Sequence, residues 1–285
     1  MKMRKTLIAS VVLALSFNAV AVNEARLEEA KKGDYWAMSG VADDYCKEGN
    51  YREAFYWQEK VINHLSFKAN ATDEDKKDLE FYMSQLADGY ARGTCAPYGE
   101  GKGKQLFLPD YRLAVRWYSR LAFIKNPVSS DPYEAKFKLA DIYFWGKGGI
   151  EKNLVRAKGY YKELAELNDD VIIEMAKKNK LSSEALQETR GNARHRLAQM
   201  YYFGNNAPQD DELAYQWAEK ARQDKNFYGA RMQAFLLYDG RGTKQNKQEA
   251  LRLMRAVCDA WGDESACNWY QDMKANRPLR REGEL

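Results

Sequence analysis

Residues 139–146 read Leu-Ala-Asp-Ile-Tyr-Phe-Trp-Gly, and residues 197–204 repeat the phrase as Leu-Ala-Gln-Met-Tyr-Tyr-Phe-Gly. Each is followed by a polar turn and then by a second phrase, Ala-x-x-(Trp/Tyr), which begins at Ala157 and at Ala214. Apolar residues three and four positions apart fall on one face of an α-helix. The sequence therefore predicts pairs of amphipathic helices, with a glycine ending the first helix of each pair.

The double phrase occurs three more times in a less regular form. These copies are centred on Ala42 and Tyr45, on Ala87 and Tyr90, and on Ala234 and Leu237. Gly204 and Gly240 are 36 residues apart, and a unit of this length buries its apolar face only by stacking on its neighbours. We therefore expect an all-α solenoid of about five helix pairs over residues 22–275, with a further helix capping its C-terminal end.

Two insertions interrupt this period, at residues 94–110 and 168–192. The first contains Gly-Glu-Gly-Lys-Gly-Lys, which lacks the Ser or Thr and the preceding strand that a phosphate-binding loop requires. Leu106 and Phe107 form an apolar tip on the same loop. Such a tip either recognises a partner or folds back over the stack, and the sequence leaves both alternatives open.

The first residues have the three-part design of a secretory signal peptide. Basic residues precede an apolar run over residues 7–17, and small residues suggest cleavage near Ala21. The run is too short to span a bilayer comfortably, so we expect residues 1–21 to be removed and no membrane insertion afterwards. These features predict an exported protein, periplasmic or secreted. The tail at residues 276–285 has little to bury and is expected to be disordered.

Removal of the signal peptide also changes the charge of the protein. The whole chain carries a formal charge of +4, and without Lys2, Arg4 and Lys5 this falls to about +1. A nucleic-acid partner would require a concentrated basic face, which the sequence does not contain. We expect no nucleic-acid binding.

Four cysteines remain in the exported chain, which favours disulfides in an oxidising compartment. Cys258 and Cys267 flank a short turn between two helical runs, and a bridge between them would join the last helix to the one before it. Cys46 and Cys95 lie near the ends of the first helices of two neighbouring units and are a second candidate pair. Zinc is the alternative for four cysteines, but no Cys-x-x-Cys motif is present and the two histidines are isolated, so we expect no metal.

The repeated phrases resemble the Sel1-like repeat, a relative of the tetratricopeptide repeat, over roughly residues 35–270. This resemblance implies a right-handed α–α superhelix whose first helices line a concave side. It also implies a protein-binding role, such as that of an adaptor, a regulator or an inhibitor. The spacing of Cys258 and Cys267 is similar to that of disulfide-stapled bacterial secreted members, with one extra residue between the cysteines.

Aromatic residues that the repeat does not require are the best binding candidates. They occupy the last turn of successive first helices, on the side that the resemblance makes concave. The candidate residues are Phe144, Trp145, Tyr202, Phe203, Tyr238 and Asp239, together with Leu106 and Phe107 on the inserted loop. Large aromatics are typical anchors of interfaces, although one member of each pair could instead pack against the neighbouring unit.

No catalytic constellation is visible in the sequence. There is no nucleophile motif with a positioned histidine, and the carboxylate pairs fit a solvated helix surface. We therefore expect no catalysis and no cofactor, and a protein partner bound through the concave face and the 94–110 loop. A narrower alternative is an immunity protein that neutralises a toxic effector delivered into the periplasm. An envelope enzyme and a scaffold with several partners are weaker alternatives.

Overall fold

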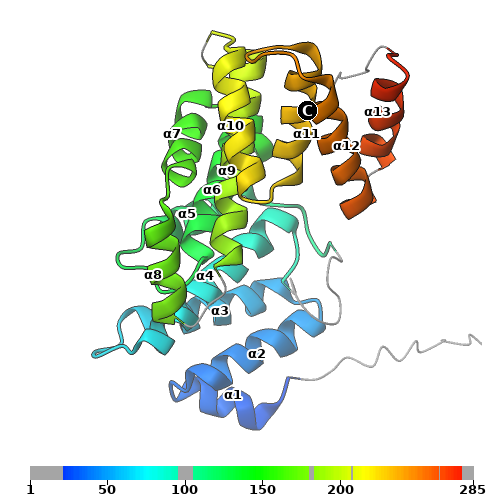
Figure 1. Cartoon of the computed structure of the whole chain (residues 1–285). Coiled ribbons are helices and arrows are strands. Elements are labelled where there is room, and N and C mark those ends of the chain that lie inside the picture. Colours follow the sequence, from blue (N-terminus) through cyan, green and yellow to red (C-terminus); the bar gives the residue numbers. More distant parts are fainter. Residues whose placement is uncertain (1–21, 96–104, 180–182, 207, 263, 278–285) are drawn as a thin grey trace, which may run out of the picture.

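The computed structural model describes residues 22–95, 105–179, 183–206, 208–262 and 264–277. Over these residues the chain is all-α and contains no β-strand (Figure 1). The predicted signal peptide, most of the tail from residue 276 and the middle of the 94–110 loop lie outside the described residues. The predicted solenoid of helix pairs is confirmed.

Five helix pairs follow one another along the chain. The first helices are α2 (Tyr35–Lys47), α4 (Asp73–Arg92), α6 (Asp131–Trp145), α9 (Glu184–Phe203) and α11 (Phe227–Asp239). The second helices are α3 (Tyr51–Ser66), α5 (Tyr111–Ala122), α7 (Leu154–Ala165), α10 (Asp211–Gln223) and α12 (Lys247–Trp261). A short helix α1 (Glu24–Lys31) precedes them, α13 (Glu264–Lys274) follows them, and a 3-10 turn, η1 (Lys147–Gly149), lies after α6.

Local chemistry determines where these helices begin and end. Gly93, Gly146, Gly204 and Gly240 end four first helices with φ of 68–71°, a left-handed conformation that costs glycine little. Every second helix starts at an Asn or Asp whose side chain accepts a backbone N–H of the first turn. A capping box formed by Thr72 and Asp75 opens α4.

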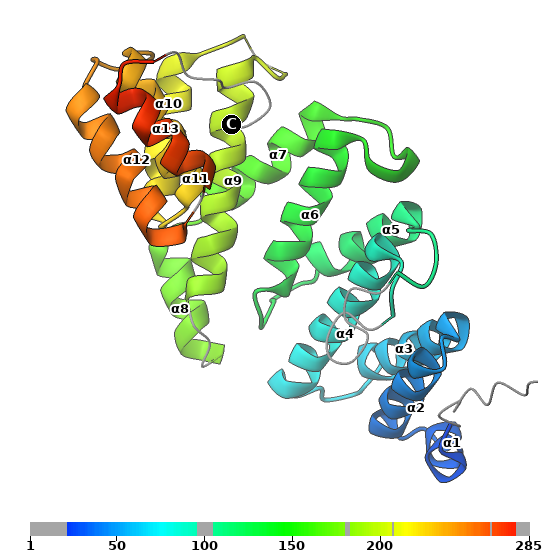
Figure 2. The same ribbon diagram turned by 90° about the vertical axis from the view of Figure 1, so that its right-hand side faces the viewer.

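The stack is not symmetric between its two layers. The first helices α4, α6 and α9 each contact the next first helix, whereas the second helices of successive pairs contact one another less. A two-layered stack curves toward the layer whose members lie closer together. The first helices therefore line the inner side of the curve, and Figure 2 shows the units turning progressively from α1 to α13.

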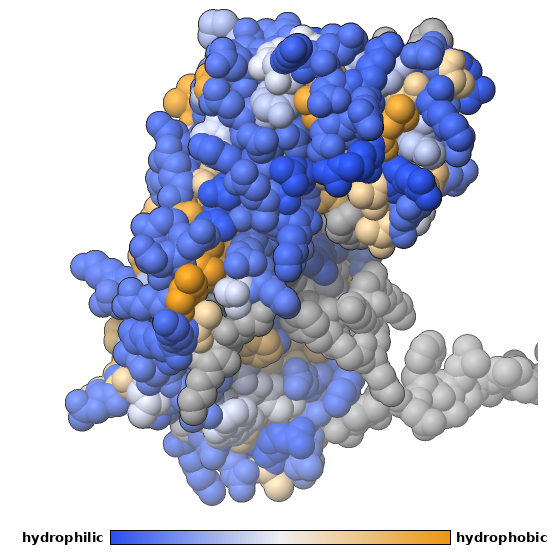
Figure 3. Space-filling view, in the orientation of Figure 1, coloured by the Kyte–Doolittle hydropathy of each residue, from blue (hydrophilic) through white to orange (hydrophobic). Residues whose placement is uncertain are grey.

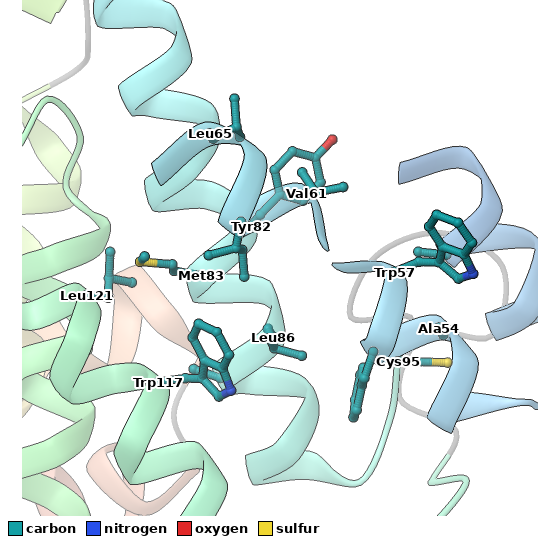
Figure 4. Close-up of a cluster of buried hydrophobic side chains, with 14 of the residues drawn as sticks. Ala54, Trp57, Val61, Leu65, Tyr82, Met83, Leu86, Cys95, Trp117 and Leu121 are labelled. Carbon is teal, nitrogen blue, oxygen red and sulfur yellow. The ribbon is translucent and has the colours of Figure 1, made fainter. Parts of the chain in front are cut away.

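The core is built where small residues meet large ones. Ala54, Ala114, Ala157 and Ala214 are fully buried, which allows close helix approach, and aromatic side chains fill the space beside them. Figure 4 shows this arrangement in the first units, where Trp57 lies beside Ala54 on α3 and Trp117 of α5 packs toward Leu86 of α4. The burial is divided into successive clusters along the stack, as expected for repeats that contact only their neighbours.

Both predicted cysteine pairs lie at bonding distance. The sulfur atoms are 2.10 Å apart in Cys46–Cys95 and 1.96 Å apart in Cys258–Cys267. The first pair joins α2 to Cys95, three residues beyond the end of α4, and the second joins α12 to α13. The bridge to α13 fits the predicted role of this helix as a cap, because α13 packs against α12 and covers the last helix pair.

The 168–192 insertion contains a helix that the sequence analysis did not predict. This helix, α8 (Asp169–Asn179), buries Ile172 and Met175 against Leu186 of α9 and Tyr133 of α6. The last part of the insertion, from Glu184, is the beginning of α9, the first helix of the fourth unit.

Candidate functional site

One row of residues on the inner helices faces both the neighbouring unit and the solvent. Residues at positions i, i+3 and i+7 share a helix face. On α4 the row contains Gln85, Asp88 and Arg92; on α6, Lys138, Asp141 and Trp145; on α9, Arg196, Gln199 and Phe203. We call these nine residues the inner stripe.

Ion pairs connect the inner stripe from one unit to the next. Lys138 Nζ of α6 lies 2.8 Å from Asp88 Oδ1 of α4, and Arg196 Nε of α9 lies 3.1 Å from Asp141 Oδ1 of α6. Asp88 is almost fully buried, and its pairing with Lys138 offsets the cost of removing the carboxylate from water. These pairs hold the inner helices in a fixed register.

A tyrosine of the second helix completes each of these contacts. The hydroxyl of Tyr118 donates to Asp88, and the hydroxyl of Tyr161 donates to Asp141. Burial, with the adjacent carboxylate, raises the pKa of both hydroxyls above the usual value. Both tyrosines therefore stay protonated at neutral pH and keep their aspartates oriented toward the next unit.

The two largest apolar side chains of the stripe remain in solvent. Trp145 is 54% exposed and Phe203 is 50% exposed, and they occupy the same position in adjacent units. The guanidinium of Arg196 lies 5.7 Å from the ring centroid of Trp145, within cation–π range. The arrangement presents apolar rings beside a cation that is already paired with Asp141.

The neighbouring aromatic candidates have a different role. Phe144, Tyr202 and Tyr238 are buried, because consecutive residues of a helix point about 100° apart and only one of each pair faces outward. Each buried ring fills the core between units, so these three candidates do not present their rings to a partner. Asp239 is exposed at the position that Trp145 and Phe203 occupy in the earlier units.

The stripe ends at the fifth unit. Met232 and Phe235 of α11 occupy the places of the polar residues and are buried, and Phe235 packs edge-on against Trp269 of α13 with ring centroids 5.0 Å apart. The cap therefore covers the inner surface of the last pair. The accessible part of the stripe belongs to the second, third and fourth units.

The apolar tip of the 94–110 loop folds back onto the stack. Phe107 stacks on Tyr51 with ring centroids 4.2 Å apart and meets Phe55 edge-on, while the backbone N–H groups of Leu106 and Phe107 donate to the Gly93 carbonyl. The sequence left open whether this tip recognises a partner or folds back. In the structure Leu106 and Phe107 fold back over the helices and are half-buried. Leu108, which is 84% exposed, remains available.

His195 lies in the core rather than in a reactive site. It is buried in α9, stacks on Tyr228 at 5.3 Å, and its Nε2 has no hydrogen-bond partner among the described residues. Burial, with the positive charges of Arg196 and Arg231, lowers its pKa to about 3. The neutral imidazole of His195 therefore contributes to core packing as an uncharged aromatic ring.

Acid should destabilise the fold through this histidine. Its pKa is about 3 when folded and about 6.5 when unfolded, so between these values only the unfolded state binds the proton. The free energy of unfolding should therefore fall as the pH drops through this window, by up to about 1.4 kcal/mol per pH unit. Urea unfolding at several pH values should show a flatter profile for His195→Phe, whereas His64→Phe, at the exposed histidine, should leave the profile unchanged.

Two kinds of feature are absent from the part of the chain that the structure describes. No group of three or more His, Cys, Asp or Glu side chains there could hold a metal ion. No helix among the same residues is long and apolar enough to cross a membrane.

The family model described as Sel1 repeat matches residues 84–122, 134–169, 191–226 and 227–260, about half of the chain. The chain belongs to the Sel1 repeat family. The four matches correspond to the pairs α4–α5, α6–α7, α9–α10 and α11–α12, and the α2–α3 pair precedes them. Sel1 repeats are protein–protein interaction modules.

Solved structures of other Sel1 repeat proteins are similar to this chain. A Sel1 repeat protein from Oxalobacter formigenes is 21% identical with a TM-score of 0.37, and the match covers 51% of this chain and 92% of that one. A putative sel1 repeat protein from Klebsiella pneumoniae subsp. pneumoniae is 18% identical (TM-score 0.37; 88% and 98% covered). The protein c5321, a protective antigen present in uropathogenic Escherichia coli strains, is 15% identical (TM-score 0.32; 90% and 68% covered).

Proposed function

We propose that this Sel1 repeat protein binds a protein partner along its inner stripe, with Trp145 and Phe203 as the apolar anchors. The observation that carries the proposal is the exposure of about half of each ring at the same position of two adjacent repeats. Burying an aromatic side chain contributes strongly to an interface, and anchors of this kind dominate binding energy. The ion pairs behind them fix the helices, so the anchors are positioned before the partner arrives.

The face drawn in Figure 3 is mostly hydrophilic, with small separate hydrophobic areas. We propose that Leu108, an exposed apolar residue of the 94–110 loop, contacts the same partner. The two disulfides support an exported location, such as the periplasm, where such bonds persist.

Replacing Trp145 and Phe203 together by Ala should weaken partner binding at least about a hundredfold, because two interface anchors are lost. The partner is obtained by affinity capture from periplasmic extract under oxidising conditions, and its Kd is then measured with purified proteins. The matched control is Tyr56→Ala with Phe123→Ala, which removes two rings that are equally exposed outside the inner stripe. Unchanged affinity of the stripe variant, or equal loss in the control, would show that the partner binds elsewhere.

The same measurement separates the roles that a binding module can have. An immunity protein or other inhibitor must hold its target long enough to block it, which requires slow dissociation. An adaptor or a regulator exchanges partners and dissociates faster. We propose the binding role itself, and the captured partner's identity and residence time assign it to one of these classes.

A further inference from the structure

A small cavity lies where the beginning of α9 meets the turn between α10 and α11. In Figure 2 the first turns of α9 extend beyond the ends of α11 and α12. These turns form one wall of the cavity and the turn between α10 and α11 forms the other, and the two walls include Glu188, Asn192, Lys225, Asn226 and Phe227. The volume is about 320 Å³, at the lower end of the range of about 300–1,000 Å³ that is usual for small-ligand sites.

Close contacts fix the two walls relative to each other. Gly191 of α9 lies so near the turn that a Cβ there would be 3.0 Å from the Cβ of Asp224 and 3.2 Å from that of Asn226. The Asn226 amide donates to Asn192 Oδ1 at 2.7 Å, and Arg190 of α9 donates to the Asp224 carboxylate. The cavity is therefore formed before any ligand enters, which lowers the ordering cost of binding.

Two side chains of opposite charge line this cavity without pairing. Glu188 lies one turn before Gly191 on the same face of α9, and Lys225 is the middle residue of the turn. Both are exposed, and neither the Glu188 carboxylate nor the Lys225 ammonium has an ion-pair or hydrogen-bond partner among the described residues. Glu184, one turn before Glu188, adds a second carboxylate to the wall. Charges held on different walls can each bind the opposite charge of a ligand that lies between them.

The backbone of Lys225 has a conformation that lysine rarely adopts. Its φ is 61°, in the left-handed region, where its N–H donates to the Arg222 carbonyl at 2.9 Å beyond the end of α10. Glycine and asparagine tolerate this conformation best, and every other non-glycine residue with positive φ among the described ones is an asparagine. A strained position occupied by lysine suggests that its side chain has a use.

We propose that the cavity binds a free amino acid with an apolar side chain. The ligand ammonium would pair with Glu188, its carboxylate with Lys225, and its side chain would pack against Phe227. A zwitterion fits better than an ion of one sign, because both charges of the cavity lack partners. This site goes beyond partner binding along the inner stripe, since neither Trp145 nor Phe203 lines it.

The first test compares ligands by calorimetry on the full exported chain. L-leucine carries both charges, N-acetylleucine lacks the ammonium, and leucinamide lacks the carboxylate. We expect leucine to bind saturably and each derivative to bind about tenfold or more weakly, because each leaves one charge of the cavity unpaired.

Two variants assign each ligand charge to its residue. Glu188→Gln should weaken leucine binding about tenfold and remove the difference between leucine and N-acetylleucine. Lys225→Asn should have the same effect on leucine and remove the difference between leucine and leucinamide. The Lys225→Asn variant should be at least as stable as the wild type in urea, because asparagine tolerates the left-handed backbone.

Matched controls make the same charge changes elsewhere. Glu53 and Lys60 are exposed on α3 of the first unit and do not line the cavity. Glu53→Gln and Lys60→Gln should leave leucine affinity unchanged. The Trp145→Ala, Phe203→Ala variant should also bind leucine like the wild type, so leucine binding and partner binding succeed or fail separately.

Several results would overturn the proposal. These are no leucine binding by the wild type, unchanged leucine binding in both Glu188→Gln and Lys225→Asn, and an equal loss in the Glu53 and Lys60 controls. Leucinamide binding as tightly as leucine would make the cavity a site for an amine and not for a zwitterion. Tighter binding of the dipeptide leucyl-leucine would overturn the assignment to a single amino acid.

Discussion

Replacing Asp224 by Ala should lower the free energy of unfolding by about 3–5 kcal/mol, because two guanidinium groups lose a buried carboxylate and Arg190 keeps only the exposed Asp169 as a carboxylate partner. Arg190 donates to both oxygens of Asp224 at 2.6–3.1 Å, and Arg194 donates to it at 2.7 Å. The exposed fraction of the side chain is 3% for Asp224 and 6% for Arg190. Water can therefore not replace the lost contacts without opening the structure.

Arg190, Arg194 and Asp224 form a buried cluster, and its position determines how the Asp224→Ala variant should unfold. Arg190 and Arg194 of α9 also bond the carbonyls of Leu167 and Ala165 at the end of α7, so the cluster joins the third unit to the fourth. Apolar burial at this junction is a separate cluster of its own. Urea unfolding followed by hydrogen exchange should thus show one transition for the wild type and two for Asp224→Ala. In the variant the third unit should unfold separately from the fourth.

A surface ion pair supplies the control for Asp224. Glu163 pairs with Lys136 but is largely exposed, and exposed pairs contribute little. Glu163→Ala should unfold like the wild type. A normal unfolding curve for Asp224→Ala would mean that the buried cluster relaxes into water and does not join the units.

Loss of the Cys46–Cys95 bridge should also destabilise the protein by about 4 kcal/mol. The bonded residues are 49 positions apart, and closing a long loop restricts the unfolded chain more than closing a short one. The Cys258–Cys267 bridge closes a separation of 9, for which the same chain-entropy argument gives about 2.7 kcal/mol. Paired Cys→Ala variants, unfolded in urea without reductant, measure both values.

The two bridges also predict effects in different places. Removing Cys46–Cys95 should raise hydrogen exchange in α2 and at the end of α4, whereas removing Cys258–Cys267 should release only α13 from α12. Adding reductant to the wild type should reproduce the variant that lacks both bridges. If the shorter loop proved the more stabilising, the entropic explanation would be wrong for this fold.

The sequence was sufficient for the features that depend on local residues. The helix pairs follow from apolar spacing, and the glycines that end α6, α9 and α11 were recognised because few other residues adopt a left-handed conformation there. Cys258 and Cys267 were paired correctly since only a short turn separates them. Such features need no knowledge of distant residues.

The contacts between neighbouring units could not be predicted from local sequence in this way. Asp88 and Asp141 each follow a Leu-Ala pair, and Lys138 and Arg196 each precede one. The residues that form the ion pairs between units therefore recur at fixed places in the repeated phrase. Their pairing depends on insertions of different length and on which helices become neighbours. The outward direction of Trp145 rather than Phe144 likewise depends on helix phase, which a one-residue uncertainty in the boundary reverses.

The link that joins each inner helix to the next determines which units are interchangeable. Asp88 and Asp141 both meet a cation of the following unit, so a gene that lost its third repeat by recombination would bring Asp88 opposite Arg196, a compatible pair. Loss of the fourth repeat would bring Asp141 opposite the buried thioether of Met232. These ion pairs are therefore compatible with shortening or duplication in the middle of the array, but not with loss of its fourth unit.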